Sequence, residues 1–242
     1  GDPDILSNLT TEVYRAQVGY PIGYFYGYST AGIFQTEEEI ANYQGAKLEG
    51  TQPGDVIWVD RNGNGVIDEN DQGMIGNPHP DVNLGLSLNV SYKGFDINMA
   101  MTGTFGNQIM KSYRSYVDLT RQNYTSDIFG RWYGEGTSNK LPRLTSGTHT
   151  NWQYNSDLYM ENGDYLRMQN ITIGYDFKKL FRSLPLKQLR LYITAQNLFT
   201  ITGYSGMDPE IGYGGHHNWA SGIDLGFYPS PRTYMVGANI KF

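Results

Sequence analysis

Two neighbouring segments alternate apolar and polar residues with a period of two, and this pattern constrains the fold more than any other feature. The two segments are residues 82–92 and 95–105, and only Lys93-Gly94 separates them. A two-residue connection predicts a tight antiparallel hairpin, in which Tyr92 pairs with Phe95 and both apolar sets share one face. The apolar sets are Val82, Leu84, Leu86, Leu88, Val90 and Tyr92, and then Phe95, Ile97, Met99, Met101 and Phe105.

Three further segments show the same alternation, which predicts an all-β chain. They are residues 165–177, 189–199 and 232–242, and a less regular, Tyr-rich sixth strand is expected near residues 13–29. In residues 165–177 the parity is imperfect. Ile171, Ile173 and Tyr175 fall on one side, whereas Leu166 and Met168 fall on the other.

The placement of charge favours strands that face lipid. Charged residues make up only 17% of the chain, against about 25% in an ordinary soluble domain. An Arg or Lys on the lipid face at mid-bilayer costs about 2–4 kcal/mol, and lipid-facing strands exclude charge from their middles. The alternative is a soluble antiparallel sandwich. The charged residues of the strands lie near strand ends, and they are Asp96, Arg167, Asp176, Arg190, Arg232 and Lys241.

The connections between the strands alternate strictly between long and short. They run over residues 30–81, 93–94, 106–164, 178–188 and 200–231. Transmembrane barrels combine short periplasmic turns with long extracellular loops, so the C-terminus is expected on the periplasmic side. Five or six strands cannot close a barrel whose smallest members have about eight. Residues 1–242 are therefore expected to be the C-terminal part of a larger protein, whose N-terminal portion supplies the remaining strands.

One segment has the spacing of metal ligands. In residues 60–71, oxygen side chains fall at loop positions 1, 3, 5, 9 and 12, and Gly65 stands at position 6, where the chain must turn. The alternative is an Asn/Gly-rich turn that bonds its own backbone. This spacing predicts Ca²⁺ bound in the extracellular loop 54–77, as a structural cofactor. The candidate ligands are Asp60, Asn62, Asn64, the Val66 carbonyl, Asp68 and Asp71.

The sequence lacks the residues that several other classes of function require. The chain has no Cys, and its net charge of −6 without a basic block argues against nucleic acid as a partner. There is no G-x-S-x-G, H-E-x-x-H or Walker A motif, so no catalytic residue is assigned and an enzyme is not expected. The basic run of residues 178–190 is interpreted as a solvated periplasmic turn. Aromatic residues of the loops, among them Trp132, Trp152 and Trp219, either pack the loops or contact cargo, and no substrate-binding residue is assigned.

Several motifs together resemble the C-terminal part of SusC/RagA-type TonB-dependent outer-membrane transporters. They are residues 189–200 (LRLYITAQNLFT), residues 206–210 (GMDPE), residues 54–56 (GDV) followed by the 60–71 loop, residues 75–78 (IGNP) and the ending from Pro229 to Phe242. The resemblance spans most of the chain from about residue 12.

This resemblance implies part of a 22-stranded barrel with an internal plug. It implies import of glycans or peptides across the outer membrane of a Gram-negative bacterium. The implied partners are the missing barrel and plug portion, the TonB complex acting through that portion, a SusD-like surface lipoprotein and outer-membrane lipid.

Two other functions compete with this one. The first is a soluble, calcium-stabilised all-β carbohydrate-binding module, and the second is part of a secreted glycoside hydrolase. Detergent dependence separates the transporter from both, because a module would stay monomeric without detergent and an enzyme would release reducing ends.

Overall fold

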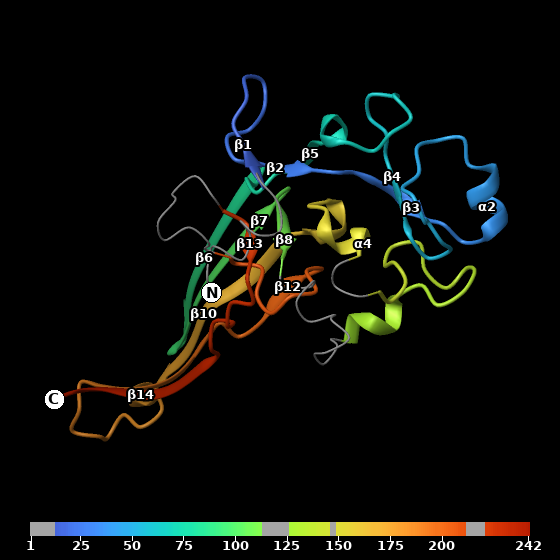
Figure 1. The fold of residues 1–242 in the computed structure, drawn as a ribbon. Coiled ribbons are helices and arrows are strands. Elements are labelled where there is room, and N and C mark those ends of the chain that lie inside the picture. Colours follow the sequence, from blue (N-terminus) through green and yellow to red (C-terminus); the bar gives the residue numbers. More distant parts are fainter. Residues whose placement is uncertain (1–12, 113–125, 146–148, 212–220) are drawn as a thin grey trace. The chain divides into compact units, whose positions relative to one another are not determined.

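A computed structural model describes residues 13–112, 126–145, 149–211 and 221–242 (Figure 1). The chain divides into two compact units. The loop unit comprises Gly1–His79, Gln108–Glu161 and Ile211–Gly226, and the sheet unit comprises Pro80–Asn107, Asn162–Glu210 and Phe227–Phe242. Among the described residues, no helix combines the length and the apolar character needed to cross a membrane.

The sheet unit is one antiparallel sheet of six strands. Its order is β14-β11-β10-β7-β6, and β12 also pairs with β10. The expected all-β, antiparallel fold class is therefore observed, with the first two strands at the predicted residues. The elements are β6 (Val82–Tyr92), β7 (Phe95–Phe105), β10 (Tyr165–Asp176), the 3-10 helix η4 (Phe177–Lys179), β11 (Gln188–Gln196), β12 (Thr200–Thr202) and β14 (Thr233–Lys241).

The hairpin of β6 and β7 has the predicted register. Tyr92 pairs with Phe95 and Val82 pairs with Phe105, without an interruption. The turn places Lys93 at φ 48° and Gly94 at φ 103°. Two successive residues with positive φ are typical of the type I′ turn, whose twist matches that of the flanking strands.

Two predicted strands differ from the observed ones. Residues 13–29 do not form a strand of this sheet, because Gly19 (φ 93°), Pro21 and Gly23 (φ 70°) break the extended backbone. The remaining pieces, β1 (Tyr14–Arg15) and β2 (Tyr24–Gly27), pair with each other in the loop unit, and β2 also pairs with β5 (Gly73–Gly76). The strand predicted over residues 189–199 ends at Gln196, because Asn197 takes a left-handed conformation with φ 50°.

The loop unit consists of short strands and helical turns within the long connections. Besides the sheet of β1, β2 and β5, it contains a sheet in which β8 pairs with both β13 and β9, and a pair of strands, β3 and β4. The remaining elements are β3 (Thr30–Ile33), α2 (Glu37–Asn42), β4 (Val56–Trp58), η1 (Glu69–Asp71), β8 (Gln108–Lys111), η2 (Ser126–Gly130), α4 (Thr150–Gln153), η3 (Asp157–Tyr159), β9 (Met160–Asn162) and β13 (Ile223–Asp224).

Aromatic side chains form the core of the loop unit. One cluster of buried residues contains Tyr28, Trp58 and Ile67, with Tyr154 packed against it. The rings of Tyr28 and Tyr154 stack with centroids 4.6 Å apart. Ile67 belongs to the candidate calcium loop, so this loop is tied to the core by a buried apolar side chain.

A buried carboxylate joins two distant segments of the loop unit. Asp55 accepts hydrogen bonds from Nε of Arg143 (2.7 Å) and Nδ2 of Asn151 (3.0 Å), and its other oxygen accepts from the N–H of Gln52 (2.9 Å). Asn151 in turn accepts from the N–H of Val56, the first residue of β4 (3.1 Å). Burial lowers the pKa of the neighbouring His149, and the imidazole Nδ1 accepts from the N–H of Asn151 (3.2 Å), which caps α4.

Candidate functional site

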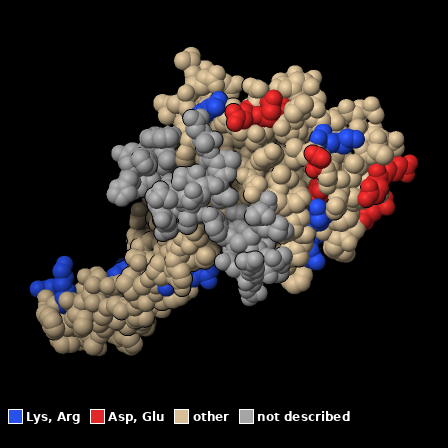
Figure 2. Space-filling model, viewed as in Figure 1, with Lys and Arg blue, Asp and Glu red and all other residues tan. Residues whose placement is uncertain are grey.

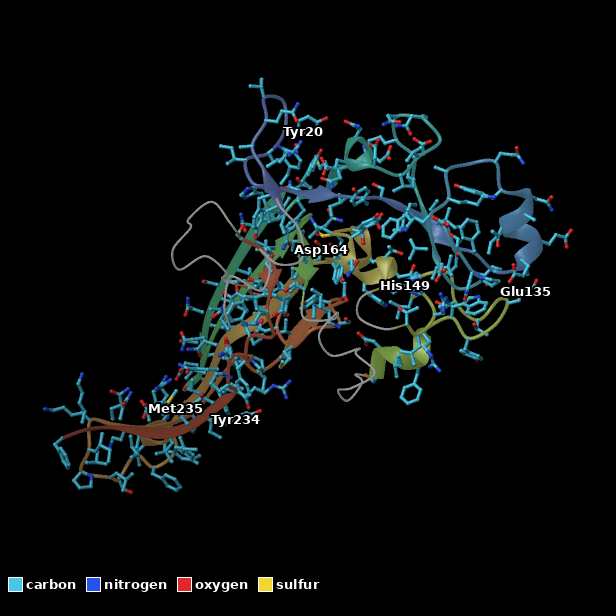
Figure 3. The ribbon with its side chains drawn as sticks, in the orientation of Figure 1. Tyr20, Glu135, His149, Asp164, Tyr234 and Met235 are labelled. Carbon is cyan, nitrogen blue, oxygen red and sulfur yellow. The ribbon has the colours of Figure 1, made fainter. Side chains whose placement is uncertain are left out.

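One face of the six-stranded sheet is apolar and exposed. Leu86 in β6 is 49% exposed, Ile193 in β11 is 60% exposed and Val236 in β14 is 82% exposed. Apolar residues on this face pair with apolar residues of the neighbouring strands. Ile193 of β11 pairs with Ile173 of β10 on one side and with Val236 of β14 on the other. Of the two residues of β14 that Figure 3 labels, Tyr234 pairs with Ala195 of β11 on the apolar face, and Met235 pairs with Thr194 on the opposite face. The sandwich alternative requires these side chains to lie between two sheets, and the described residues do not bury them there.

A β-bulge restores the parity of β10. The register against β7 shifts between Met168 and Asn170, so that Leu166 pairs with Gly103, Met168 with Met101 and Ile171 with Met99. The extra residue, Gln169, reverses the alternation. Leu166 and Met168 therefore lie on the same face as Ile171, and the expectation that they point to the opposite face is wrong.

The polar face carries an ion pair that spans three strands. Arg190 of β11 reaches across β10 and donates from Nε to Oδ1 of Asp96 in β7 (2.8 Å) and from a terminal nitrogen to Oδ2 (2.5 Å). The crossing passes over Gly174, where a Cβ would lie 2.6 Å from the guanidinium. Arg190 thus lies in the strand predicted over residues 189–199 and cross-links the sheet, and its inclusion in the solvated basic run of residues 178–190 is corrected.

A second buried arginine anchors the connection after β12. Arg167 of β10 is 3% exposed, and it bonds Glu210 (2.7 Å), Asp208 and the hydroxyl of Thr200 (3.0 Å). Asp208 also accepts from the N–H of Ser230 (3.1 Å), so one network holds the chain before β14. A cavity of about 560 Å³ lies beside it, lined among others by Arg167, Asp208 and Ser230. Sequence reasoning did not identify these residues as a site, although the charge of Arg167, in a strand whose only other charged residue is Asp176 at its end, was the available signal.

Most of the predicted ligands of the candidate calcium loop accept hydrogen bonds from backbone N–H groups of the same loop. Asp60 accepts from the N–H groups of Gly63 (2.7 Å) and Gly65 (2.7 Å). Asn62 accepts from the N–H of Asn64 (2.9 Å), and Asn64 accepts from the N–H of Val66 (2.8 Å). Gly63 and Gly65 have φ of 71° and 82°, so the sharp turns at positions 4 and 6 depend on glycine.

Asp71 closes the loop on its first residues. Its carboxylate is fully buried and accepts from the N–H groups of Arg61 (2.8 Å) and Asp68 (2.8 Å). Burial raises the pKa of Asp71, but these hydrogen bonds and a side-chain contact with Asp60 outweigh it and hold the pKa below its usual range. The loop thus brings two carboxylates together, with Asp60 against Asp71.

The donor set of this loop suits a hard cation. Three carboxylates, two amide oxygens and a backbone carbonyl are the oxygen ligands that Ca²⁺ takes. Nδ2 of Asn64 lies 3.3 Å from Oδ2 of Asp68, and the N–H of Val66 donates to the side-chain oxygen of Asn64. These three candidate ligands therefore lie close together. Within the described ranges, no three His, Asp or Glu side chains converge enough to hold a metal by themselves. A cation here would need the amide and carbonyl oxygens as well.

Two of the loop tryptophans pack against the protein. Trp132 donates from its indole nitrogen to Gln35 (3.1 Å) and lies against Gly54, where a Cβ would be 2.4 Å from its ring. Trp152 packs on a second cluster of buried apolar residues in the loop unit, and its ring meets that of Tyr159 edge-on with centroids 6.2 Å apart; this cluster consists of Phe25, Met110, Tyr159 and Ile223. Trp219, the third candidate for cargo contact, lies outside the described residues.

Comparison with known proteins identifies the class. A TonB-dependent receptor of Formosa agariphila is 33% identical to this chain over 232 residues, which are 93% of this chain and 22% of the receptor. The TonB-dependent receptor SusC of Bacteroides thetaiotaomicron is 31% identical, over 96% of this chain and 20% of that protein. The chain spans about a fifth of the length of these curated relatives. No family model matches it.

Solved structures show the same fold. The RagAB peptide transporter superposes on 95% of this chain, and on 24% of its own, with a TM-score of 0.70 at 21% identity. The RagAB peptide importer in its closed state gives a TM-score of 0.68 at 22% identity. The chain therefore has the sequence and fold of a portion of a TonB-dependent receptor. Within that class its similarity is to the SusC/RagA type, as its motifs predict, and these relatives are receptors rather than enzymes.

Proposed function

We propose that this chain forms barrel strands and external loops of an outer-membrane importer, which takes up oligosaccharides or peptides together with a SusD-like lipoprotein. The C-terminus then lies on the periplasmic side, and TonB acts through the missing plug portion. The observation that carries this proposal is the exposed apolar face that continues across β6, β7, β10, β11 and β14. Such a face is stable in lipid, and in water it would promote association.

The comparisons support import and leave two cargo classes. SusC, at 31% identity, favours glycans through the family resemblance, whereas the titles of the RagAB structures speak of peptides. We take oligosaccharides as the first cargo to test, because the sequence is more similar to SusC than to RagAB.

Deletion of the full-length receptor is expected to abolish growth on the imported oligosaccharide as sole carbon source, and the intact gene should restore it. Loss of TonB should have the same effect, because import depends on that energy supply. Growth and uptake of labelled oligosaccharides and labelled peptides are measured side by side. A full-length protein that stays monomeric without detergent and binds sugar unaided would instead support the soluble module.

We further propose that the 60–71 loop binds Ca²⁺ and thereby fixes the external loop 54–77. The proposal is supported by the oxygen donor set and by the two acidic groups, Asp60 and Asp71, in contact inside it. A divalent cation can be bound by both groups, which stand at the first and last positions of the loop. Because Ile67 packs on the aromatic core, ordering of this loop would be transmitted to that core.

The Asp60→Asn variant is expected to lower calcium affinity by about tenfold or more, because it removes one ligand charge. Gly63 and Gly65 donate to different carboxylate oxygens of Asp60, and the single side-chain oxygen of Asn can still accept from one of these N–H groups, so part of the turn is retained without the ion. The measurement is calcium titration of the full-length receptor by calorimetry and thermal unfolding.

The matched control is Glu69→Gln, which removes the same charge from an exposed residue that is not a predicted ligand. It should leave calcium affinity within about twofold, since affinity depends on the charge of the ligands. Absence of calcium binding in the unmodified receptor, or equal loss in both variants, would reject the site.

A further inference from the structure

Basic side chains gather at one end of the six-stranded sheet. Two short connections and the end of β14 meet there. Residues 177–187, which connect β10 to β11, hold four cations and no carboxylate. In the view of Figure 2, this end of the molecule, where Figure 1 places the C-terminus, shows Lys and Arg and no Asp or Glu. We call this group the basic end, and it consists of Lys93, Lys178, Lys179, Arg182, Lys187 and Lys241.

Backbone contacts hold the three segments of the basic end together. The N–H of Asp176 donates to the carbonyl of Gly94 in the β6–β7 turn (2.8 Å), and the N–H of Lys187 donates to the carbonyl of Lys241 (2.8 Å). Lys178 is used internally, because its Nζ donates to the carbonyl oxygens of Arg182 (2.7 Å) and Leu184 (2.6 Å). The group is therefore a fixed array.

The other five cations are exposed and face solvent in this chain. The two carboxylates nearby are already engaged. Asp96 is bound by Arg190, and Asp176 accepts from the N–H groups of Lys178 (3.1 Å) and Leu189 (3.2 Å). The ion pairs found among the described residues use other cations, namely Lys111, Arg143, His149, Arg167 and Arg190. The basic end thus presents positive charge that the described part of the chain does not neutralise.

A row of aromatic rings connects the apolar face to the basic end. Phe95 contacts Tyr175 at 4.4 Å between centroids, Tyr175 contacts Phe177 at 5.0 Å, and Phe177 stacks on Phe181 at 6.5 Å. Aromatic side chains concentrate at the boundary between hydrocarbon and headgroups, and Lys and Arg beyond them extend towards the headgroups. The rings therefore place the basic end at headgroup level, provided that the apolar face lies in lipid.

We propose that the basic end binds the headgroups of anionic phospholipids in the leaflet at that end of the barrel. The inference rests on the proposed membrane embedding of the sheet. Lys179, Arg182 and Lys187 supply the exposed charge, and Lys178 fixes the turn that carries them. Each cation near an anionic membrane surface strengthens binding by about fivefold. The site takes phosphodiester headgroups with a net negative charge and discriminates against zwitterionic ones.

The test uses the full-length receptor in nanodiscs that contain equal amounts of phosphatidylglycerol and phosphatidylcholine. Lipids that remain bound after release into the gas phase are identified by native mass spectrometry. The unmodified receptor should retain phosphatidylglycerol in preference. The triple variant Lys179→Gln, Arg182→Gln, Lys187→Gln should reduce the ratio of the two retained lipids by about fivefold or more.

A charge-conserving triple variant is the matched control, with Lys179→Arg, Arg182→Lys and Lys187→Arg. It should keep the preference, whereas loss of preference in this variant would overturn the electrostatic basis of the proposal. An unchanged ratio in the Gln variant, or complete displacement of the lipid by inorganic phosphate, would also overturn it. Failure of the unmodified receptor to enter these nanodiscs would contradict the proposed membrane embedding instead, so the two failures are distinguishable.

Discussion

Leu86→Arg in the full-length receptor is expected to destabilise the folded barrel by about 2–4 kcal/mol, because the guanidinium would lie in hydrocarbon near mid-bilayer. Leu86 is close to the middle of the eleven-residue strand β6, is 49% exposed and pairs with Met101 on the apolar face. The measurement is the fraction of folded receptor in the outer membrane, together with the urea concentration at which the purified receptor unfolds in detergent.

Two controls separate charge from shape and from position. Leu86→Ala removes the side chain without adding a charge, and it should cost much less than Leu86→Arg. Ser87→Arg places the same charge one residue along the strand, on the polar face opposite Ala100. If Ser87→Arg proves the more damaging change and Leu86→Arg is tolerated, the two faces of the sheet are assigned the wrong way round.

The strands of the sheet were predictable because their signal is local. Strict alternation over residues 82–105 around Lys93-Gly94 leaves one register that keeps both apolar sets together, and the structure has that register. The strand that includes Leu166 and Met168 could not be assigned in the same way. Its bulge at Gln169 is defined by pairing with β7, which is distant in the sequence.

The Tyr-rich segment of residues 13–29 misled the prediction for a different reason. Its composition favours strands, but Pro21 and the glycines at positive φ limit it to two short pieces. The long connections were predicted only as loops. Their small sheets depend on contacts such as that of Gly27 with Asn155, which are more than a hundred residues apart. The alternation of apolar and polar residues along one segment cannot predict such contacts.

The candidate sites also differ in whether their signal is local in the sequence. The ligand spacing of residues 60–71 can be read within twelve residues, and the structure brings Asp60 and Asp71 together. Arg190, by contrast, was predicted near the end of a strand but was also counted with the solvated basic run of residues 178–190, so its contact within the sheet was not foreseen. Its partner Asp96 lies across an intervening strand. The role of Gly174, which leaves room for the contact, cannot be predicted until the register of the strands is known.

Asp55→Ala is expected to destabilise the loop unit locally by about 3 kcal/mol, because it leaves the partly buried Arg143 and the buried Asn151 without their acceptor. Asp55 is 4% exposed and its ion pair with Arg143 joins segments that are 88 residues apart. The amide hydrogens of residues 143 and 149–153 should exchange about a hundredfold faster with solvent. Hydrogen exchange of the full-length receptor, followed by mass spectrometry of its peptides, measures this change.

The double variant Asp55→Ala, Arg143→Ala provides the sharper test. If the cost of Asp55→Ala comes mainly from the unpaired guanidinium, removal of Arg143 should recover part of the protection, and the double variant should cost less than the sum of the single variants. Strictly additive effects would mean that the ion pair contributes nothing by itself. In that case the segments would be joined by Asn151, whose Oδ1 accepts from Val56, and Asn151→Ala would become the more damaging change.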